Sequence, residues 1–127
     1  MTVPTDLLYT EEHEWVRFYD NGIAEFGITH HAQDQLGSIV YVELPEEGDE
    51  LSQNDSIGQV ESTKSVSDIF APLSGTVIEA NKGLQDHPEQ INTDPYTDGW
   101  LLKIKLDDIN ERDELMTPGE YKDHVGG

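Results

Sequence analysis

The sequence predicts a mainly β protein, built as a sandwich or barrel of short antiparallel strands with two short helices added. Runs rich in β-branched and aromatic residues recur along the chain, and Gly- and Pro-containing turns separate them at intervals of about 8 to 12 residues. The chain has 127 residues, the length of one ordinary domain. We therefore expect residues 1–127 to form a single domain.

The first predicted hairpin surrounds Asn21-Gly22, a pair that favours tight turns between strands. Strand-like runs lie on both sides of it, at 14–19 and 23–28. A short helix near 29–36 follows, because Thr29 is a good N-cap residue and Gly37 stands where helices often end. Further strands are expected at 38–44, 50–52, 57–62, 67–71, 75–80 and 100–105.

A second short helix is expected near 107–116, where Ile109 and Leu115 provide apolar positions at helical spacing. Pro118-Gly119 should end it, and a short acidic tail should follow. Residues 107–127 are therefore predicted to be a C-terminal helix and tail that pack on, or trail from, the β core.

Charge excludes several classes of partner. Seven basic residues against 27 acidic ones give a net charge of −20, which disfavours nucleic acid and anionic membranes. The acids run from Asp6 to Asp123. This distribution indicates either a solvated acidic surface, as in proteins that work in concentrated salt, or a surface for basic partners.

Composition also limits the compartment and the chemistry. The first residues lack the basic start and apolar run of a signal peptide, so we expect a cytoplasmic protein of a salt-loving prokaryote, or else a processed protein of the mitochondrial matrix. The chain contains no cysteine, which excludes disulfides and thiolate metal sites. The adjacent His30 and His31 would point about 100° apart on a helix, and no metal site is predicted.

Lys64 lies midway between two predicted strands, at the tip of a hairpin. Its small neighbours Ser62, Thr63 and Ser65 should leave the amine accessible to a modifying enzyme. Glu61 and Asp68 flank the turn and could orient a partner. From spacing alone, an ordinary solvent-exposed lysine is the simpler interpretation.

Resemblance to a known family gives Lys64 a role. Residues 61–68, Glu-Ser-Thr-Lys-Ser-Val-Ser-Asp, followed by Ala-Pro-Leu-Ser-Gly at 71–75, resemble the lipoylation site of the glycine cleavage system H protein family. The similarity covers most of the chain and includes His-Glu-Trp at 13–15, the stretches 27–33 and 36–45, Pro-Glu-Gln-Ile-Asn at 88–92 and Asp-Pro-Tyr-Thr-Asp-Gly-Trp-Leu at 94–101. Thr63, Ser65 and Ser38 depart from the residues common in the family.

The resemblance implies a fold, a cofactor and partners. The fold would be the barrel-sandwich hybrid of lipoyl domains, and Lys64 would carry lipoate in amide linkage. The chain would be a monomeric, non-catalytic carrier that moves an aminomethyl group during glycine catabolism and one-carbon metabolism. Its partners would be a pyridoxal-phosphate glycine decarboxylase, a tetrahydrofolate-dependent aminomethyltransferase, dihydrolipoamide dehydrogenase and a lipoate-attaching enzyme. That last enzyme would recognise Glu61, Ser62, Thr63, Ser65, Ser67 and Asp68.

The resemblance also implies a cleft that protects the loaded arm, where carboxylates pair with the ammonium group. By motif, the candidates are Glu14 of His-Glu-Trp and Asp68 after the lysine, with Glu12 as a further one. Ordinary structural roles, as a strand carboxylate or a turn residue, remain open for each.

Two other interpretations remain open. The chain could be a related lipoyl relay that passes the cofactor to other enzymes, or an unmodified acidic interaction module that has kept the fold. An independent enzyme is not expected, because the sequence shows no nucleophile–base pair, metal cluster or phosphate-binding loop.

Overall fold

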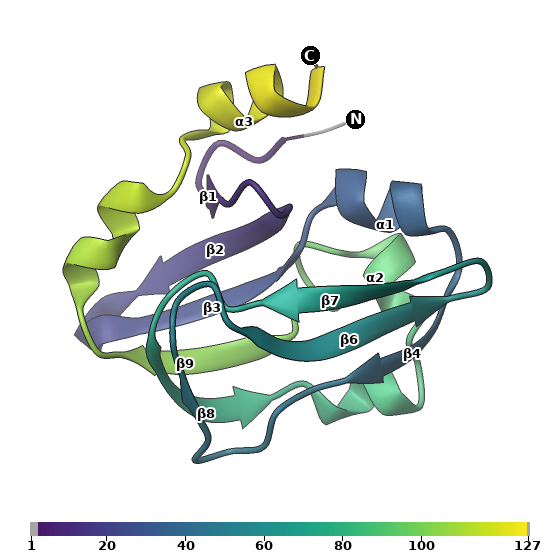
Figure 1. Cartoon of the computed structure of the whole chain (residues 1–127), viewed down its shortest axis with the longest axis horizontal. Helices are drawn as coiled ribbons and strands as arrows, with labels where there is room; N and C mark the ends of the chain where they lie inside the picture. The colour runs from purple at the N-terminus through teal and green to yellow at the C-terminus, as the bar shows by residue number, and fades with distance from the viewer. Residues whose placement is uncertain (1–2, 127) are drawn as a thin grey trace.

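The computed structural model describes residues 3–126, which form two antiparallel sheets packed around a shared core (Figure 1). The larger sheet has the strand order β1-β2-β3-β9-β8-β5, with β1 Leu8–Tyr9, β2 Glu14–Tyr19, β3 Ile23–Ile28, β9 Leu102–Leu106, β8 Gly75–Ala80 and β5 Glu50–Leu51. The smaller sheet has the order β4-β6-β7, with β4 Ile39–Glu43, β6 Ser56–Ser62 and β7 Val66–Phe70. The mainly β prediction is confirmed.

The predicted N-terminal hairpin and first helix are confirmed. Asn21 and Gly22, in the short 3-10 helix Asp20–Gly22 between β2 and β3, both have positive φ, 68° and 72°, as a tight hairpin turn requires. Helix α1 spans His30–Leu36. The Thr29 hydroxyl accepts a hydrogen bond from the Ala32 N–H, and Gly37, at φ 86°, ends the helix.

The C-terminal prediction is partly wrong. A helix does form inside 107–116, but it is the short 3-10 helix Ile109–Glu114. Pro118 does not end helical structure: it begins α3, Pro118–Gly126, where an acidic tail was expected. The Thr117 backbone N–H donates to the Glu120 carboxylate, and the Glu120 N–H donates to the Thr117 hydroxyl. This reciprocal cap starts a helix, and proline is well tolerated in a first turn.

Three other short elements were not predicted from the sequence. Strand β1 is only two residues long and pairs with β2. The 3-10 helix Lys82–Gln85 and helix α2, Gln90–Thr93, follow β8. Within residues 3–126, no helix is long and apolar enough to cross a membrane.

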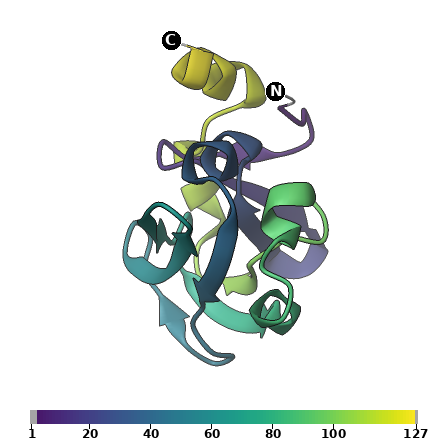
Figure 2. The same ribbon diagram turned by 90° about the vertical axis from the view of Figure 1, so that its right-hand side faces the viewer.

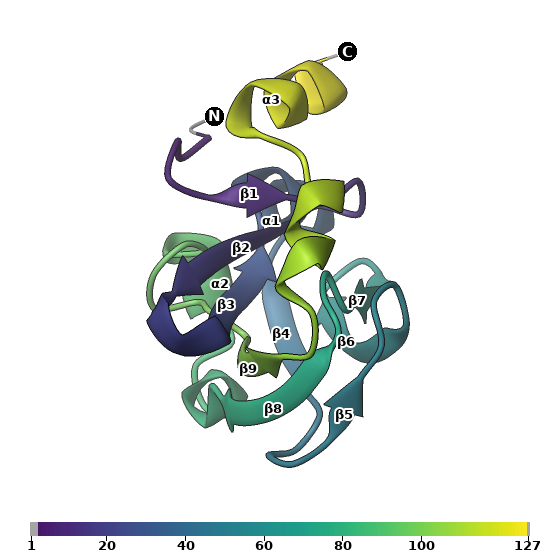
Figure 3. The same ribbon diagram turned by 90° about the vertical axis from the view of Figure 1, so that its left-hand side faces the viewer.

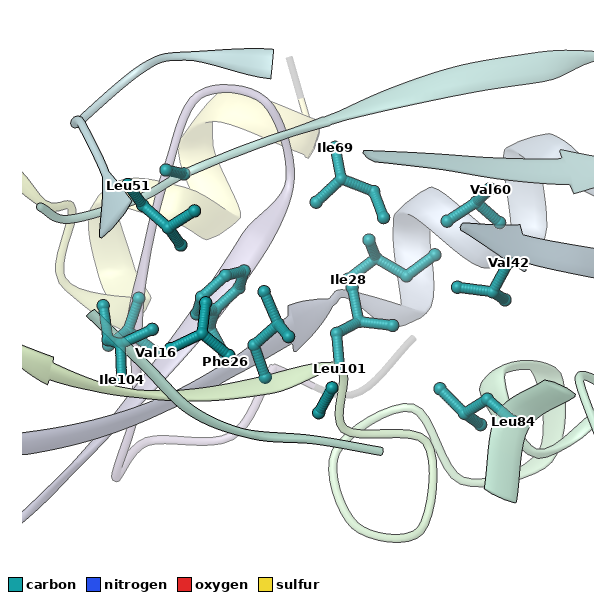
Figure 4. Close-up of a cluster of buried hydrophobic side chains, with 14 of the residues drawn as sticks. Val16, Phe26, Ile28, Val42, Leu51, Val60, Ile69, Leu84, Leu101 and Ile104 are labelled. Carbon is teal, nitrogen blue, oxygen red and sulfur yellow. The ribbon is translucent and has the colours of Figure 1, made fainter. Parts of the chain in front are cut away.

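Side chains from both sheets meet in the core (Figure 4). Val16, Phe26 and Ile104 come from the six-stranded sheet, whereas Val60 and Ile69 come from the three-stranded sheet. Phe26 and Ile104 are fully buried. Because both sheets contribute to one apolar cluster, the burial of that cluster holds them together.

A second cluster fastens α3 to the start of the chain. Tyr121 of α3 is fully buried and stacks on Tyr9 of β1, with ring centroids 4.5 Å apart. Its hydroxyl lies 2.9 Å from His13 Nδ1 and 2.7 Å from Thr29 Oγ1. Trp15 joins this cluster. Figure 3 shows the chain rising from β9 to α3 past β1 and β2.

Candidate functional site

Lys64 stands in the turn between β6 and β7, which projects at the right of Figure 1. Ser62 organises this turn. Its N–H donates to the Ser65 carbonyl at 2.8 Å, and its hydroxyl accepts from the N–H groups of Lys64 and Ser65. The Thr63 N–H donates to the Ser38 carbonyl. The backbone is therefore held on both sides while the Lys64 side chain is exposed.

The Lys64 amine is free of ion pairs within the described part of the chain. Lys64 is also the only basic residue in β4, β6, β7 and their connecting turn. Gly37, at the end of α1, is its close neighbour: a Cβ added there would lie 3.4 Å from Lys64 Cε. In Figure 2, α1 lies between the three-stranded sheet and α2.

The residues predicted for recognition by a lipoate-attaching enzyme fall into two groups. Ser62 is buried and supports the turn. The others are exposed around Lys64, on the turn or on the adjoining strands: Glu61, Thr63, Ser65, Ser67 and Asp68.

Glu14 lies at the start of β2, only 2 % exposed, on the wall of a cavity of about 440 Å³. The Thr10 hydroxyl donates to Glu14 Oε1 at 2.6 Å, and the Phe70 backbone N–H also donates to this carboxylate. Burial raises the pKa of the Glu14 carboxyl to about 7, despite these two hydrogen bonds. The cavity is lined by Tyr9, Thr10, Glu11, Glu12, Glu14, Gln53, Asn54, Phe70, Pro72, Glu114, Leu115 and Met116.

The three predicted cleft carboxylates are not all brought together. Glu12 and Glu14 line the same cavity. Asp68 lies outside it, exposed on β7, where the Gln59 side chain donates to its carboxylate at 3.4 Å. Strand β7 nevertheless connects the lysine to the cavity. Val66 follows the turn and Phe70 lines the cavity wall, and the usual rise of a strand separates these two residues by about 13 Å.

No pattern in the sequence indicates the far wall of this cavity. The backbone N–H and the hydroxyl of Ser74 both donate to the Glu111 carboxylate, at 2.7 and 2.9 Å. This double contact fixes the 3-10 helix Ile109–Glu114 against the turn between β7 and β8, and so positions residues 114–116 at the cavity. No local pattern links positions 37 residues apart. Among the described residues, no group of three or more His, Asp or Glu side chains is arranged to hold a metal ion.

Comparison with known proteins gives the family. The sequence model described as glycine cleavage H-protein matches residues 7–126. The chain belongs to this family. Its members are carrier subunits, not enzymes.

The similarity extends over whole relatives. A probable glycine cleavage system H protein of Haloarcula marismortui is 52% identical over 123 residues, 97% of this chain and 96% of that protein. The glycine cleavage system H protein of Listeria monocytogenes is 52% identical over 124 residues, 96% of this chain and 97% of the relative. The crystal structure of a glycine cleavage system H protein from Mycobacterium marinum superimposes with a TM-score of 0.91, at 41% identity, over 98% of this chain and 100% of that one.

Proposed function

We propose that this chain is the lipoyl carrier of glycine cleavage, with lipoate attached to Lys64 through an amide bond. It would take an aminomethyl group from glycine decarboxylase to a tetrahydrofolate-dependent aminomethyltransferase, and present the arm to dihydrolipoamide dehydrogenase for reoxidation. When bound, lipoate supplies a dithiolane that accepts the aminomethyl group and two electrons. The observation that carries the proposal is Lys64 itself, an exposed amine with no ion pair among residues 3–126, on a hydrogen-bonded turn in a chain of this family.

The turn fits a site of covalent attachment. The hydrogen bonds of Ser62 and Thr63 hold the backbone without using the lysine amine. A fixed backbone with a free side chain keeps Nζ within one side-chain length of a defined anchor, where an attaching enzyme can reach it. After amide formation, the same arrangement keeps the tethered group at a high effective concentration near each partner site.

The chain's own contribution to the cargo would be the Glu14 carboxyl. Glu14 is almost fully buried on the cavity wall, so its ionised form attracts an ammonium group more strongly there than it would in water. Its pKa of about 7 means that the free carrier holds this group partly protonated at neutral pH. An arriving cation would favour the ionised form. Glu12 adds negative charge to the same cavity.

Intact mass tests the attachment. The protein is expressed with a lipoate ligase and free lipoate, and compared with Lys64→Arg and with Lys82→Arg, which changes another exposed lysine. We expect one added lipoyl group in the wild type and in Lys82→Arg, and none in Lys64→Arg. A folded wild-type protein that gains no mass from an active ligase, or from the organism's own lipoylating enzymes, would contradict the proposal and favour an unmodified interaction module.

A further inference from the structure

The outer face of the three-stranded sheet places a distant strand beside Lys64. Tyr41 of β4 pairs with Glu61 of β6, and Glu61 pairs with Val66 of β7. Directly paired residues share one face of a sheet. Tyr41, Glu61 and Val66 therefore form a row across the sheet, at the end where β6 turns into β7 and presents Lys64.

Exposed apolar side chains lie on this row and directly beside it. Val40, Tyr41 and Val66 are 51 %, 47 % and 54 % exposed. They are three of the six large apolar residues that the described chain leaves most exposed, and the other three lie singly on other elements. Val40 stands at an irregularity in the pairing of β4 with β6, next to Tyr41. Apolar side chains that gather on an exposed face are typical of an interaction site, and tyrosine is enriched among residues that dominate binding energy.

Acidic residues surround this apolar centre. The next row of the sheet pairs Glu43 with Gln59 and Gln59 with Asp68, and Glu61 lies between Tyr41 and Val66. None of these carboxylates has an ion pair within residues 3–126. A partner that covers the face must therefore supply positive charge at the edge and apolar surface at the centre.

The reach of the lysine decides which partner needs this face. An unmodified amine stays within one side-chain length of the turn, so an enzyme that acylates it must come close to the turn and to the row of residues beside it. Enzymes that use the finished arm can reach it from farther away, because the attached group adds length. In the acylation, Nζ forms a C–N bond to the carbonyl carbon of an activated lipoyl donor, the bond to the activating group breaks, and the amine loses a proton without any change of oxidation state.

We propose that Val40, Tyr41 and Val66, with their acidic surround, form the docking surface for the lipoate-attaching enzyme, which presents a basic surface with an apolar centre. The inference rests on the proposed attachment at Lys64 and extends recognition from the hairpin to strand β4. Recognition then depends on residues more than 20 positions upstream of the lysine, brought into place by strand pairing.

The test compares two pairs of substitutions. Tyr41→Ser with Val66→Ser removes the apolar centre, and Tyr19→Ser with Ile78→Ser removes apolar residues of similar exposure, 47 % and 42 %, on β2 and β8. Initial rates of lipoylation are measured by intact mass as a function of carrier concentration. We expect kcat/KM to fall about tenfold or more in the first pair, mainly through KM, because interface anchors carry most of the binding energy. The second pair should stay within twofold of wild type.

Charge gives an independent measurement. We expect the wild-type rate to fall as salt rises, and Glu43→Gln to weaken that salt dependence, whereas Glu50→Gln on β5 should leave it unchanged. Thermal melts of every variant check that the fold is intact.

A further assay separates attachment from later use of the arm. The Tyr41→Ser, Val66→Ser carrier, lipoylated to completion with excess enzyme, should be reduced by dihydrolipoamide dehydrogenase and NADH at the wild-type rate. If the rate of reduction falls about as much as kcat/KM for lipoylation, the assignment to the attaching enzyme would be overturned. Equal lipoylation rates in the two double variants would also overturn it and confine recognition to the hairpin, without affecting the proposed function. A wild-type protein that is never lipoylated would remove both proposals.

Discussion

The outer faces of the two sheets differ in how their charged side chains are paired. On the six-stranded sheet, Arg17, Glu25, Lys103 and Glu79 lie opposite one another across four strands. Arg17 pairs with Glu25 at 2.7 Å, and Lys103 lies 3.9 Å from Glu25 and 3.6 Å from Glu79. The charges in this row alternate in sign, so each side chain lies beside one of opposite charge.

The three-stranded sheet has no such balance. Its corresponding row, Tyr41, Glu61 and Val66, carries apolar groups and an acid with no basic residue on any of the strands. Lys64 is the single cation at its edge, and amide formation would remove that charge. The comparison indicates that the charges on one face stabilise the fold, whereas the other face matches the docking surface proposed above.

Removing Glu25 should have the largest effect on stability. Glu25 is 5 % exposed, and Glu25→Ala would leave Arg17 and Lys103 on a partly buried face without their shared partner. We expect a loss of about 3 kcal/mol in the free energy of unfolding. Glu61→Ala, on the other sheet, should change it by less than about 0.5 kcal/mol. Urea denaturation measures the free energy of unfolding of both variants. Equal losses would contradict the inference that charge pairing stabilises the six-stranded sheet but not the three-stranded one.

Glu14 and Glu25 allow a comparison within one sheet. Both are buried, but no ion pair to a basic side chain is found for Glu14 in the described chain. Its pKa is raised from 4.5 to about 7, so the unfolded chain gives up this proton more readily. Folding stability should therefore fall as pH rises from about 4.5 to 7 and stay lower above it. Glu14→Gln should remove this loss. The free energy of unfolding of the variant, relative to wild type, should therefore rise by about 2 kcal/mol between pH 4.5 and pH 8. Urea denaturation of both proteins across pH tests the sign, and a constant difference would contradict it.

Glu14→Gln should also affect the loaded carrier. We expect lipoylation to be unchanged and the lifetime of the aminomethyl form to shorten about tenfold, because a charge-assisted hydrogen bond contributes about 1.5 kcal/mol. The release of formaldehyde and ammonia from isolated loaded carrier measures the lifetime. Glu12→Gln, an exposed acid on the same cavity, should shorten it less. An unchanged lifetime in Glu14→Gln would remove Glu14 from this role.

Ionic strength should give the smallest effect. With a net charge of −20, self-repulsion grows as salt is diluted and the screening length increases. We expect a loss of about 1 kcal/mol between molar and low salt, or roughly 4 °C in Tm. At low salt, Glu43→Gln should raise Tm slightly, whereas Glu79→Gln, which loses its contact with Lys103, should not. A Tm that does not change with salt would contradict a role for the acidic surface in salt adaptation.

Local signals predicted much of this fold. Asn21-Gly22 and the pair Thr29 and Gly37 specify their turn and helix through backbone geometry, which neighbouring residues fix. Helix α3 departs from the prediction because Pro118 is typical both of a helix end and of a first turn, and only the cap formed by Thr117 and Glu120 distinguishes the two. Strand β1 could not be found, since two residues show no alternation and depend on pairing with β2.

The candidate site also has one part that local sequence signals predict and another part that depends on distant contacts. The position of Lys64 follows from its strands and its motif, whereas the surroundings of Glu14 depend on contacts between distant segments. Phe70 and Met116 reach its cavity from β7 and from the chain before α3. The family resemblance implied that Asp68 shares a cleft with Glu14, but strand alternation turns Asp68 to the outer face, where it pairs across the sheet with Gln59.

Gly37 ends α1 with a positive φ and has no side chain beside the stem of Lys64. A larger residue there would strain the backbone and occupy space through which the lysine methylenes rotate. The helix end therefore sets the range of directions open to the arm. On the proposed carrier, a wide range would let a group attached to Lys64 reach several enzymes of different shape from a single anchor, and the glycine would provide that range without loosening the turn.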